Sequence, residues 1–366
     1  MSTSPFMAPS GRRRSREAAR RRRRRRRRQL LGVALVVALA ALLTLVHPWH
    51  THASSTTSHR AGGAGALARA DGRAGTPRPA LSPAGLPLGQ PPLRLDLADS
   101  AADPVRLDDP EQPRAGLLFN LDTGQVLWQL HPYARLRIAS LTKMMTALLT
   151  VRSSAPDAPV LVTRQAEETS GSKVGVLPLG HHVQLETMLY GLLLPSGNDA
   201  AVALAQHVAG TVHRFVGEMN AEAAALGMGC THYSSPSGYY NTHNYSCAAD
   251  LAELAHVDLA QPRIAQVTRT YEAVRPFPIA GGKLYLDNNN PLLIYGYPGT
   301  TGLKTGYTLE AGRCLVATAE RHGVRLGVVL LHSPAPGTQA SQLLNDAFEH
   351  IYHQRPVPAP PMPPDA

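Results

Sequence analysis

The chain has 366 residues and a formal net charge of +10, and that charge comes from its N-terminal end. Residues 12–28 hold 13 arginines and one glutamate, whereas residues 29–366 hold 23 basic and 25 acidic residues. The body of the protein therefore lacks the basic surface typical of a nucleic-acid-binding domain, and we expect no nucleic-acid partner.

An uncharged run of 17 residues follows the arginines, at residues 30–46. This length is at the short limit for a transmembrane helix and is long for the core of a signal peptide. Arginines before the run, and almost none directly after it, predict that the N-terminus lies in the cytoplasm. We expect a cytoplasmic tail at residues 1–29, a single-pass signal anchor in the cell membrane at 30–46, and an extracytoplasmic body. Cleavage near residues 51–53, which would release a secreted protein, is the alternative.

Two further segments have compositions that do not favour a packed core. Residues 47–113 consist largely of Ala, Gly, Pro, Ser and Arg, and residues 353–366 are rich in proline. Such segments bury too little apolar surface to offset the entropy of ordering. We expect a disordered spacer at 47–113, one folded domain at 114–352, and a disordered tail after it.

Within the folded domain, strands are predicted at both ends and helices in the middle. The strands form two hairpins, 116–120 with 125–130 and 315–318 with 324–331, each around a turn sequence. Helical spacing of apolar residues is found from residue 138 onward and at 185–194, 199–208, 215–226 and 338–352. This order predicts an α+β fold, in which one antiparallel sheet takes strands from both ends of the domain and is flanked by helices.

The three cysteines are an odd number for an exported protein. Cys230 and Cys247 are candidates for a disulfide, whereas Cys314 lies in a predicted strand and is expected to pack as a small apolar residue. Cys230 with His232, and His243 with Cys247, also look like pairs of zinc ligands. Their spacing matches no common zinc site, so we expect no metal.

Lysine is rare in this chain, with four lysines against 32 arginines, yet Lys143 stands in the motif Ser140-x-x-Lys143. Residues three apart lie on the same face of a helix, so the Lys143 amine can reach the Ser140 hydroxyl. Burial lowers the pKa of a lysine and allows it to act as a general base toward a serine nucleophile. The motif alone is weak, because about one such match is expected by chance in a chain of this length.

Two more motifs follow in order: Ser196-Gly197-Asn198 at a helix–helix turn, and Lys304-Thr305-Gly306 in a strand region. Together the three motifs resemble those of penicillin-binding proteins and serine β-lactamases. The closer resemblance is to the low-molecular-mass D-alanyl-D-alanine carboxypeptidases. It covers about residues 115–331 and extends to the segments 138–146, 192–201, 215–228 and 302–312.

The resemblance implies the fold of the serine β-lactamases and DD-peptidases and a catalytic set of Ser140, Lys143 and Ser196. Ser140 would attack the carbonyl between the two terminal D-alanines of a peptidoglycan stem peptide, and Lys143 would take its proton. Ser196 would relay a proton to the leaving amine. The implied partners are the stem peptide and β-lactam antibiotics, and no cofactor is implied.

The same resemblance implies five substrate-binding residues. Asn198 would hold the substrate amide and the Lys143 region, while Lys304 and Thr305 would bind the terminal carboxylate. Gly306 would let the strand approach the substrate closely. The backbone N–H of Tyr307 would form an oxyanion hole together with that of the nucleophile.

The sequence departs from the family at two places. The usual Asn-Pro-x-Gly-Leu stretch is replaced by Ser-Pro-Ser-Gly-Tyr at 235–239, and the arginine common after the last strands has no clear counterpart. Arg313 or Arg325 could take its place. The alternative activities are a DD-endopeptidase, which would use the same residues on cross-links, and a serine β-lactamase. The absence of glutamate between residues 227 and 250 argues against the β-lactamase.

Overall fold

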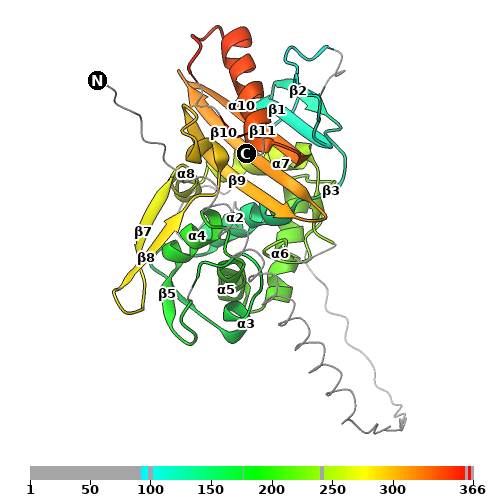
Figure 1. Cartoon of the computed structure of the whole chain (residues 1–366). Coiled ribbons are helices and arrows are strands. Elements are labelled where there is room, and N and C mark those ends of the chain that lie inside the picture. Colours follow the sequence, from blue (N-terminus) through cyan, green and yellow to red (C-terminus); the bar gives the residue numbers. More distant parts are fainter. Residues whose placement is uncertain (1–91, 98–101, 176, 240–242, 359–361, 364–366) are drawn as a thin grey trace, which may run out of the picture. The chain divides into compact units, whose positions relative to one another are not determined.

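Strands from the two ends of the described chain meet in one antiparallel sheet, as predicted (Figure 1). The computed structural model describes residues 92–97, 102–175, 177–239, 243–358 and 362–363, all within one compact unit. The sheet has the strand order β2-β1-β11-β10-β9. Its strands are β1 (Ala115–Asn120), β2 (Val126–Leu130), β9 (Thr300–Thr308), β10 (Gly312–Arg321) and β11 (Val324–Ser333).

Both predicted hairpins form, and their turns explain why. His322 and Gly323 between β10 and β11 both have positive φ, 48° and 79°, which suits a tight hairpin turn. Between β1 and β2, the Asn120 side chain accepts hydrogen bonds from the N–H groups of Asp122 and Thr123. Because β1 pairs with β11 and β9 pairs with β10, β9 is left as a free edge of the sheet.

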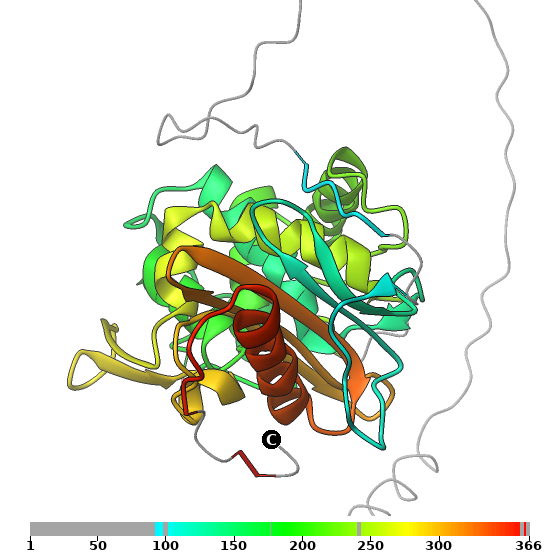
Figure 2. The same cartoon turned by 90° about the horizontal axis from the view of Figure 1, so that it is seen from above.

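Helices cover both faces of the sheet, and Figure 2 shows α10 (Pro336–Asp346) on one side of it. Leu118, Leu315 and Val328 face α10 in one apolar cluster, together with Leu343 and Leu344 of that helix. The neighbouring positions on the strands point to the other face, because side chains alternate along a strand. There the sheet contacts α7 (Ala248–Leu259) and α8 (Pro262–Thr268). The other central helices are α2 (Lys143–Ser153), α4 (Leu185–Leu193), α5 (Asn198–Ala209) and α6 (Val212–Ala225).

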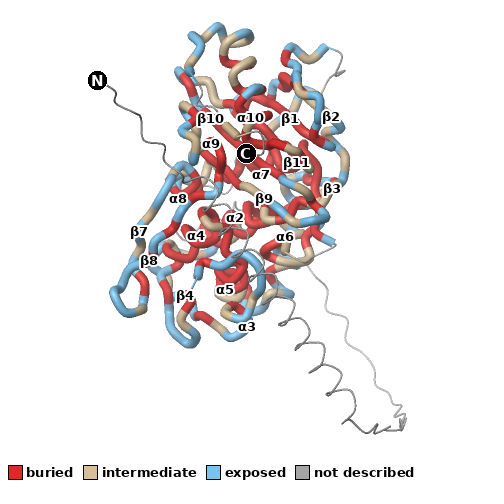
Figure 3. The backbone as a smooth tube through the Cα atoms, viewed as in Figure 1, coloured by how far each residue is buried: buried red, intermediate tan, exposed pale blue. Residues whose placement is uncertain are grey.

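Smaller elements complete the fold. A hairpin of β7 (Glu272–Pro276) and β8 (Lys283–Asp287) is largely exposed, whereas the central sheet is buried (Figure 3). The remaining pieces are the 3-10 turn η2 (Ala139–Thr142), the π-helical turn η3 (Ala347–Ile351), the helices α3 (Arg164–Glu167) and α9 (Pro291–Ile294), and the strands β3 (Leu136–Arg137), β4 (Pro159–Leu161), β5 (His182–Gln184) and β6 (Tyr245–Ser246). The sequence did not predict α3, α7, α8, α9 or the short strands β3 to β8, whereas η2 and η3 lie within predicted helical segments.

The end of the predicted spacer is ordered, so the domain boundary at residue 114 was placed too late. Val105 and Leu107 are buried against the α10 face of the sheet. Val105 N–H donates to the Leu127 carbonyl at 3.0 Å, and Asp103 accepts from Gln129 N at 2.9 Å. The segment therefore lies along β2 and covers this edge of the sheet, which would otherwise expose unpaired backbone groups.

The predicted arginine-rich tail, the anchor at 30–46 and residues 47–91 of the spacer lie outside the described residues. Among the residues that the structure describes, no helix has the length and hydropathy of a membrane span.

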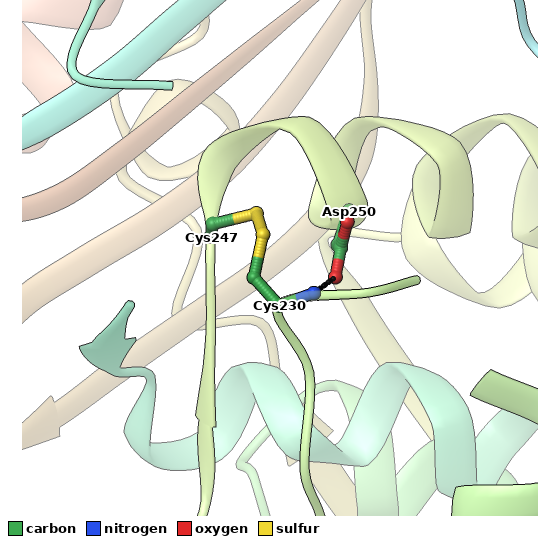
Figure 4. A group of neighbouring side chains, drawn as sticks. All are labelled: Cys230, Cys247 and Asp250. Carbon is green, nitrogen blue, oxygen red and sulfur yellow. Dashed lines mark hydrogen bonds between the residues drawn. A yellow bond between two sulfur atoms is a disulfide. The ribbon is translucent and has the colours of Figure 1, made fainter. Parts of the chain in front are cut away.

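Cys230 and Cys247 form a disulfide with a Cα–Cα distance of 5.8 Å, as Figure 4 shows. Cys314 is free and buried, as expected. Asp250 lies beside the disulfide and accepts hydrogen bonds from Cys230 N at 2.9 Å and Thr231 Oγ1 at 2.6 Å. The sulfur–sulfur bond uses both thiols that the zinc alternative would require as thiolate ligands.

Candidate active site

The motif Ser140-x-x-Lys143 spans the junction between the turn η2 and helix α2. Ser140 lies in the first turn of η2, where backbone N–H groups have no partner within the helix. Ala139, just before it, has a positive φ of 47°, which marks a tight change of chain direction. Ser140 lines a groove on the described surface, so its hydroxyl is accessible to a ligand.

Lys143 is fully buried and makes three hydrogen bonds through its side-chain amine. Nζ lies 2.8 Å from Ser140 Oγ, 2.8 Å from Asn198 Oδ1 and 3.0 Å from the Ser237 carbonyl oxygen. An amine with two strong acceptors is held in one position, and the third contact points it at the serine hydroxyl. The arrangement matches that of a nucleophile beside a general base.

The electrostatics of the pocket favour a neutral amine at Lys143. Burial lowers its pKa well below the usual value, and the nearby Lys304 cation lowers it further. The Asp199 carboxylate acts in the opposite direction but is the weakest of the three influences. Lys304 is also fully buried, and burial lowers its pKa to about 7. Both lysines of the motifs therefore have depressed pKa values, and only Lys143 contacts the serine.

Ser196 and Asn198 lie at the turn between α4 and α5, as predicted, but they face different surroundings. Ser196 has a positive φ of 66° and lines the groove, and its buried hydroxyl has no hydrogen-bond partner. Asn198 is buried, with Oδ1 on Lys143 and Nδ2 donating to the Ser170 carbonyl at 2.8 Å. Asn198 thus positions the lysine, and its contact with the substrate amide stays a prediction.

Strand β9 carries the third motif along the free edge of the sheet. Lys304 is buried, while Thr305, Gly306 and Tyr307 line the groove, with the Tyr307 side chain 62% exposed. A Cβ on Gly306 would lie 2.8 Å from the Ile138 carbonyl oxygen and 3.1 Å from Ser140 N. Gly306 therefore allows β9 to lie close to the turn that carries Ser140, and its close approach to the substrate stays a prediction.

The segment 235–239 contributes a contact that sequence reasoning missed. The Ser237 carbonyl accepts from Lys143, and Thr146 Oγ1 donates to the Pro236 carbonyl at 2.7 Å. Gly238 has a φ of 75°, and a Cβ there would lie 1.9 Å from the Ala139 carbonyl oxygen. Although this stretch departs from the family pattern, it packs directly on the nucleophile turn. Gly238 was the only sign of this packing in the sequence of the segment. The contact of the Ser237 carbonyl could not be predicted, because every residue has a backbone carbonyl.

Asp199 contributes to the site through hydrogen bonds with backbone N–H groups. Its Oδ1 accepts from Val174 N at 2.9 Å and from Ala200 N at 2.8 Å. Burial raises the pKa of this carboxyl, while the backbone N–H groups oppose the rise. Asn198 N–H donates to the Ser172 carbonyl at 2.8 Å, and Ser172 lines the groove. Asp199 and Asn198 thereby fasten the loop at 170–174 beside the nucleophile.

The groove has a volume of about 1100 Å³ and extends from the catalytic motifs past the end of the sheet. The two arginines that the sequence left as alternatives differ in their position relative to this groove. Arg313 lines the groove, and its position in β10 pairs with Tyr307 in β9. Arg325 lies elsewhere, paired with Asp122 at 2.8 Å. Of these two arginines, Arg313 is therefore the one that lines the groove.

Comparisons with known proteins agree with the geometry. Residues 108–335 match the family model for D-alanyl-D-alanine carboxypeptidase, Peptidase S11. The chain is 34% identical over 254 residues to a D-alanyl-D-alanine carboxypeptidase of Bacillus subtilis, an alignment that covers 67% of this chain and 64% of that protein. It is also 34% identical to a D-alanyl-D-alanine endopeptidase of Pseudomonas aeruginosa, over 65% of this chain and 78% of the relative.

A solved structure shows the same fold. The crystal structure of a D-alanyl-D-alanine carboxypeptidase from Mycobacterium tuberculosis superposes with a TM-score of 0.62 and 32% sequence identity. The superposition covers 70% of this chain and 96% of that structure. It supports the α+β fold predicted from the sequence.

Proposed function

The chain belongs to the D-alanyl-D-alanine carboxypeptidase family, and from that membership we propose that it is a serine DD-carboxypeptidase acting on peptidoglycan stem pentapeptides. The single observation that carries the proposal is the 2.8 Å hydrogen bond between Lys143 Nζ and Ser140 Oγ, made by a lysine whose pKa is lowered by burial. This pair supplies the nucleophile and the base that acyl transfer requires.

In the first half of the reaction, Ser140 Oγ attacks the carbonyl carbon between the two terminal D-alanines, and its proton passes to the neutral Lys143 amine. The N–H groups of Ser140 and Tyr307 hold the negative oxygen of the tetrahedral intermediate. When the C–N bond breaks, the leaving amine receives a proton from Lys143, relayed through the unpaired hydroxyl of Ser196. The products are free D-alanine and an ester at Ser140.

In the second half, water attacks the ester carbonyl and gives a proton to the neutral Lys143 amine. Lys143 passes this proton to Ser140 Oγ as the ester C–O bond breaks, and the shortened peptide leaves with a new carboxyl group, which ionises. Thr305, which lines the groove, holds the terminal carboxylate of the incoming peptide in this proposal, and the buried Lys304 supplies a positive charge beside it. β-Lactam antibiotics would acylate Ser140 by the same route, which makes the protein a target of penicillin.

The product of the reaction separates the carboxypeptidase from the endopeptidase named among the relatives. Purified protein is incubated in parallel with a stem pentapeptide and with a cross-linked peptide dimer. We expect free D-alanine from the pentapeptide at a rate well above loss of the dimer. The opposite ratio would make the protein an endopeptidase. Rapid turnover of penicillin, in place of a stable adduct, would make it a β-lactamase.

We propose further that the catalytic domain is extracytoplasmic and held at the cell membrane by residues 30–46, as expected from the sequence. The Cys230–Cys247 disulfide supports an oxidising compartment. N-terminal sequencing of the protein from a membrane fraction tests the anchor. A mature N-terminus near residue 54, with the protein in the soluble fraction, would replace the anchor with a cleaved signal.

A further inference from the structure

Residues that precede the first strand form one wall of the active-site groove. The lead-in segment, defined here as residues 109–114, contributes Glu111, Gln112 and Arg114 to the lining that also contains Ser140. Within the segment, Asp109 accepts from Glu111 N at 2.9 Å, and Gln112 Nε2 donates to the Asp109 carbonyl at 2.6 Å. These bonds give the segment a defined conformation of its own.

Gln339 of helix α10 fastens the lead-in segment to the domain. Its side chain is completely buried, and Nε2 donates to Asp109 Oδ2 at 2.9 Å and to the Glu111 carbonyl at 2.7 Å. Its Oε1 accepts from Ser333 Oγ at 2.7 Å. A buried amide with its hydrogen bonds satisfied is costly to disturb, so it holds the wall of the groove in place.

The register of the strands gives the distance between this wall and β9, the edge strand that carries Tyr307. Tyr307 pairs with Arg313 and Arg313 with Ser333 across β9, β10 and β11. Arg114 stands directly before β1, the next strand of the sheet, and its N–H donates to the Leu331 carbonyl at 3.1 Å. Strands lie about 4.8 Å apart, which places Arg114 about 14 Å from Tyr307. An extended peptide covers that span with about four residues.

The charges along this row are predominantly positive. Arg313 and Arg114 are both exposed in the groove, with Glu111 as the acidic residue of its lining. Neither arginine takes part in an ion pair with any residue that the structure describes. Guanidinium groups bind carboxylates through paired hydrogen bonds, so the outer part of the groove suits an anionic peptide.

We propose that the lead-in segment is a specificity wall, on which Arg114 binds a side-chain carboxylate of the stem peptide on the N-terminal side of the reacting alanines. Gln339 is a positioning residue that holds this wall. The inference rests on the proposed DD-carboxypeptidase function. A small β-lactam occupies the region around Ser140 and does not reach Arg114, so its reaction is independent of the wall.

The test compares two pentapeptides that differ only in one side chain before the terminal D-alanines, which carries either a free carboxylate or its amide. The full-length protein is assayed as wild type, Arg114→Gln and Gln339→Leu, with Arg164→Gln as a control on the exposed surface. We expect wild type to prefer the carboxylate peptide about tenfold in kcat/KM, mainly through KM. Both groove variants lose this preference, and the control keeps it.

Acylation by benzylpenicillin, measured on the same proteins, separates the possible failures. We expect rates within twofold of wild type for all variants. If wild type does not react with penicillin, the proposed function itself is wrong. If wild type reacts but does not distinguish the two peptides, or if both groove variants retain the preference, the specificity wall is wrong. A parallel loss of penicillin acylation in Gln339→Leu would also overturn the inference, since the residue would then support the catalytic centre.

Discussion

The Lys304 cation lowers the pKa of Lys143 in the interior of the active site, although only Lys143 contacts the nucleophile. The two lysines have different tasks in the proposed reaction. Lys143 must be neutral to accept a proton from Ser140. Lys304 must be charged to attract the terminal carboxylate of the peptide. Burial moves both pKa values in the same direction, and the pKa of Lys304 falls to about 7. The coupling between the two groups is therefore measurable.

The first prediction concerns the pH dependence of acylation. The rate with penicillin rises with pH as Lys143 loses its proton. Replacing Lys304 by methionine removes a cation that lowers the pKa of Lys143. The rising limb of the acylation rate against pH therefore moves to higher pH. Stopped-flow acylation from pH 5 to pH 10, about every half unit, locates this limb. The exposed Lys283→Met serves as control and should leave it unchanged. An unshifted limb in Lys304→Met would contradict the coupling.

A second prediction concerns stability. The pKa of Lys304 is about 7 in the folded protein against 10.5 for the ordinary side chain, so between these values the unfolded chain binds a proton that the folded chain does not. The Lys304 contribution to the free energy of unfolding is therefore most favourable above pH 10.5 and is lost as the pH falls toward 7. Its slope is about 1.4 kcal/mol per pH unit.

Lys304→Met lacks this contribution. Urea unfolding of wild type and variant between about pH 8 and pH 10 should show the wild-type free energy rising more steeply by roughly that slope. Parallel curves for the two proteins would mean that Lys304 keeps an ordinary pKa in the folded state.

A third prediction tests the packing of the segment 235–239 on the nucleophile turn. Gly238→Ala places a Cβ 1.9 Å from the Ala139 carbonyl oxygen at a φ of 75°, so the backbone must move. We expect a loss of about 3 kcal/mol in stability and slower acylation, since the Ser237 carbonyl holds Lys143. Gly217→Ala in α6 meets nothing within 4 Å and should be neutral or slightly stabilising. Equal effects of the two substitutions would refute the contact.

The disulfide gives a fourth prediction. Cys230 and Cys247 close a loop with a sequence separation of 17, and removing such a bridge costs about 3 kcal/mol. The double variant Cys230→Ala/Cys247→Ala should unfold at lower urea concentration while it keeps the acylation rate. Reductant should lower the urea midpoint of the wild type to that of the variant and should leave the midpoint of the variant unchanged. A reductant effect of equal size on both proteins would assign the stability to another group.

The order of secondary structure and the three motifs could be predicted because each has a local signature. The hairpin turns, the apolar spacing of the central helices and the triplets at 140–143, 196–198 and 304–306 are all visible in the sequence. The order of residues 92–97 and 102–113 was missed because their composition is that of a linker. The alternation of Leu93, Leu95 and Leu97, and of Val105 and Leu107, was the signal that they pack on the domain.

Other features of the site arise only in three dimensions. The Ser237 carbonyl reaches Lys143 across 94 positions of sequence, and Gln339 reaches Asp109 across 230. Neither contact leaves a local pattern, because a backbone carbonyl and a lone glutamine have no spacing rule. The depressed pKa of Lys304 likewise depends on the burial of its side chain, which the motif alone does not specify.

The most direct test of the proposed mechanism is to trap the acyl-enzyme with a fluorescent penicillin and to identify the labelled residue by peptide mass spectrometry. The mechanism predicts a single adduct on Ser140, no labelling of Ser140→Ala, and a loss of at least about a hundredfold in rate for Lys143→Arg, because arginine cannot act as a base. Lys304→Arg should be slowed but still labelled. Labelling of Ser140→Ala at the wild-type rate, or a near-normal rate for Lys143→Arg, would contradict the assignment of nucleophile and base.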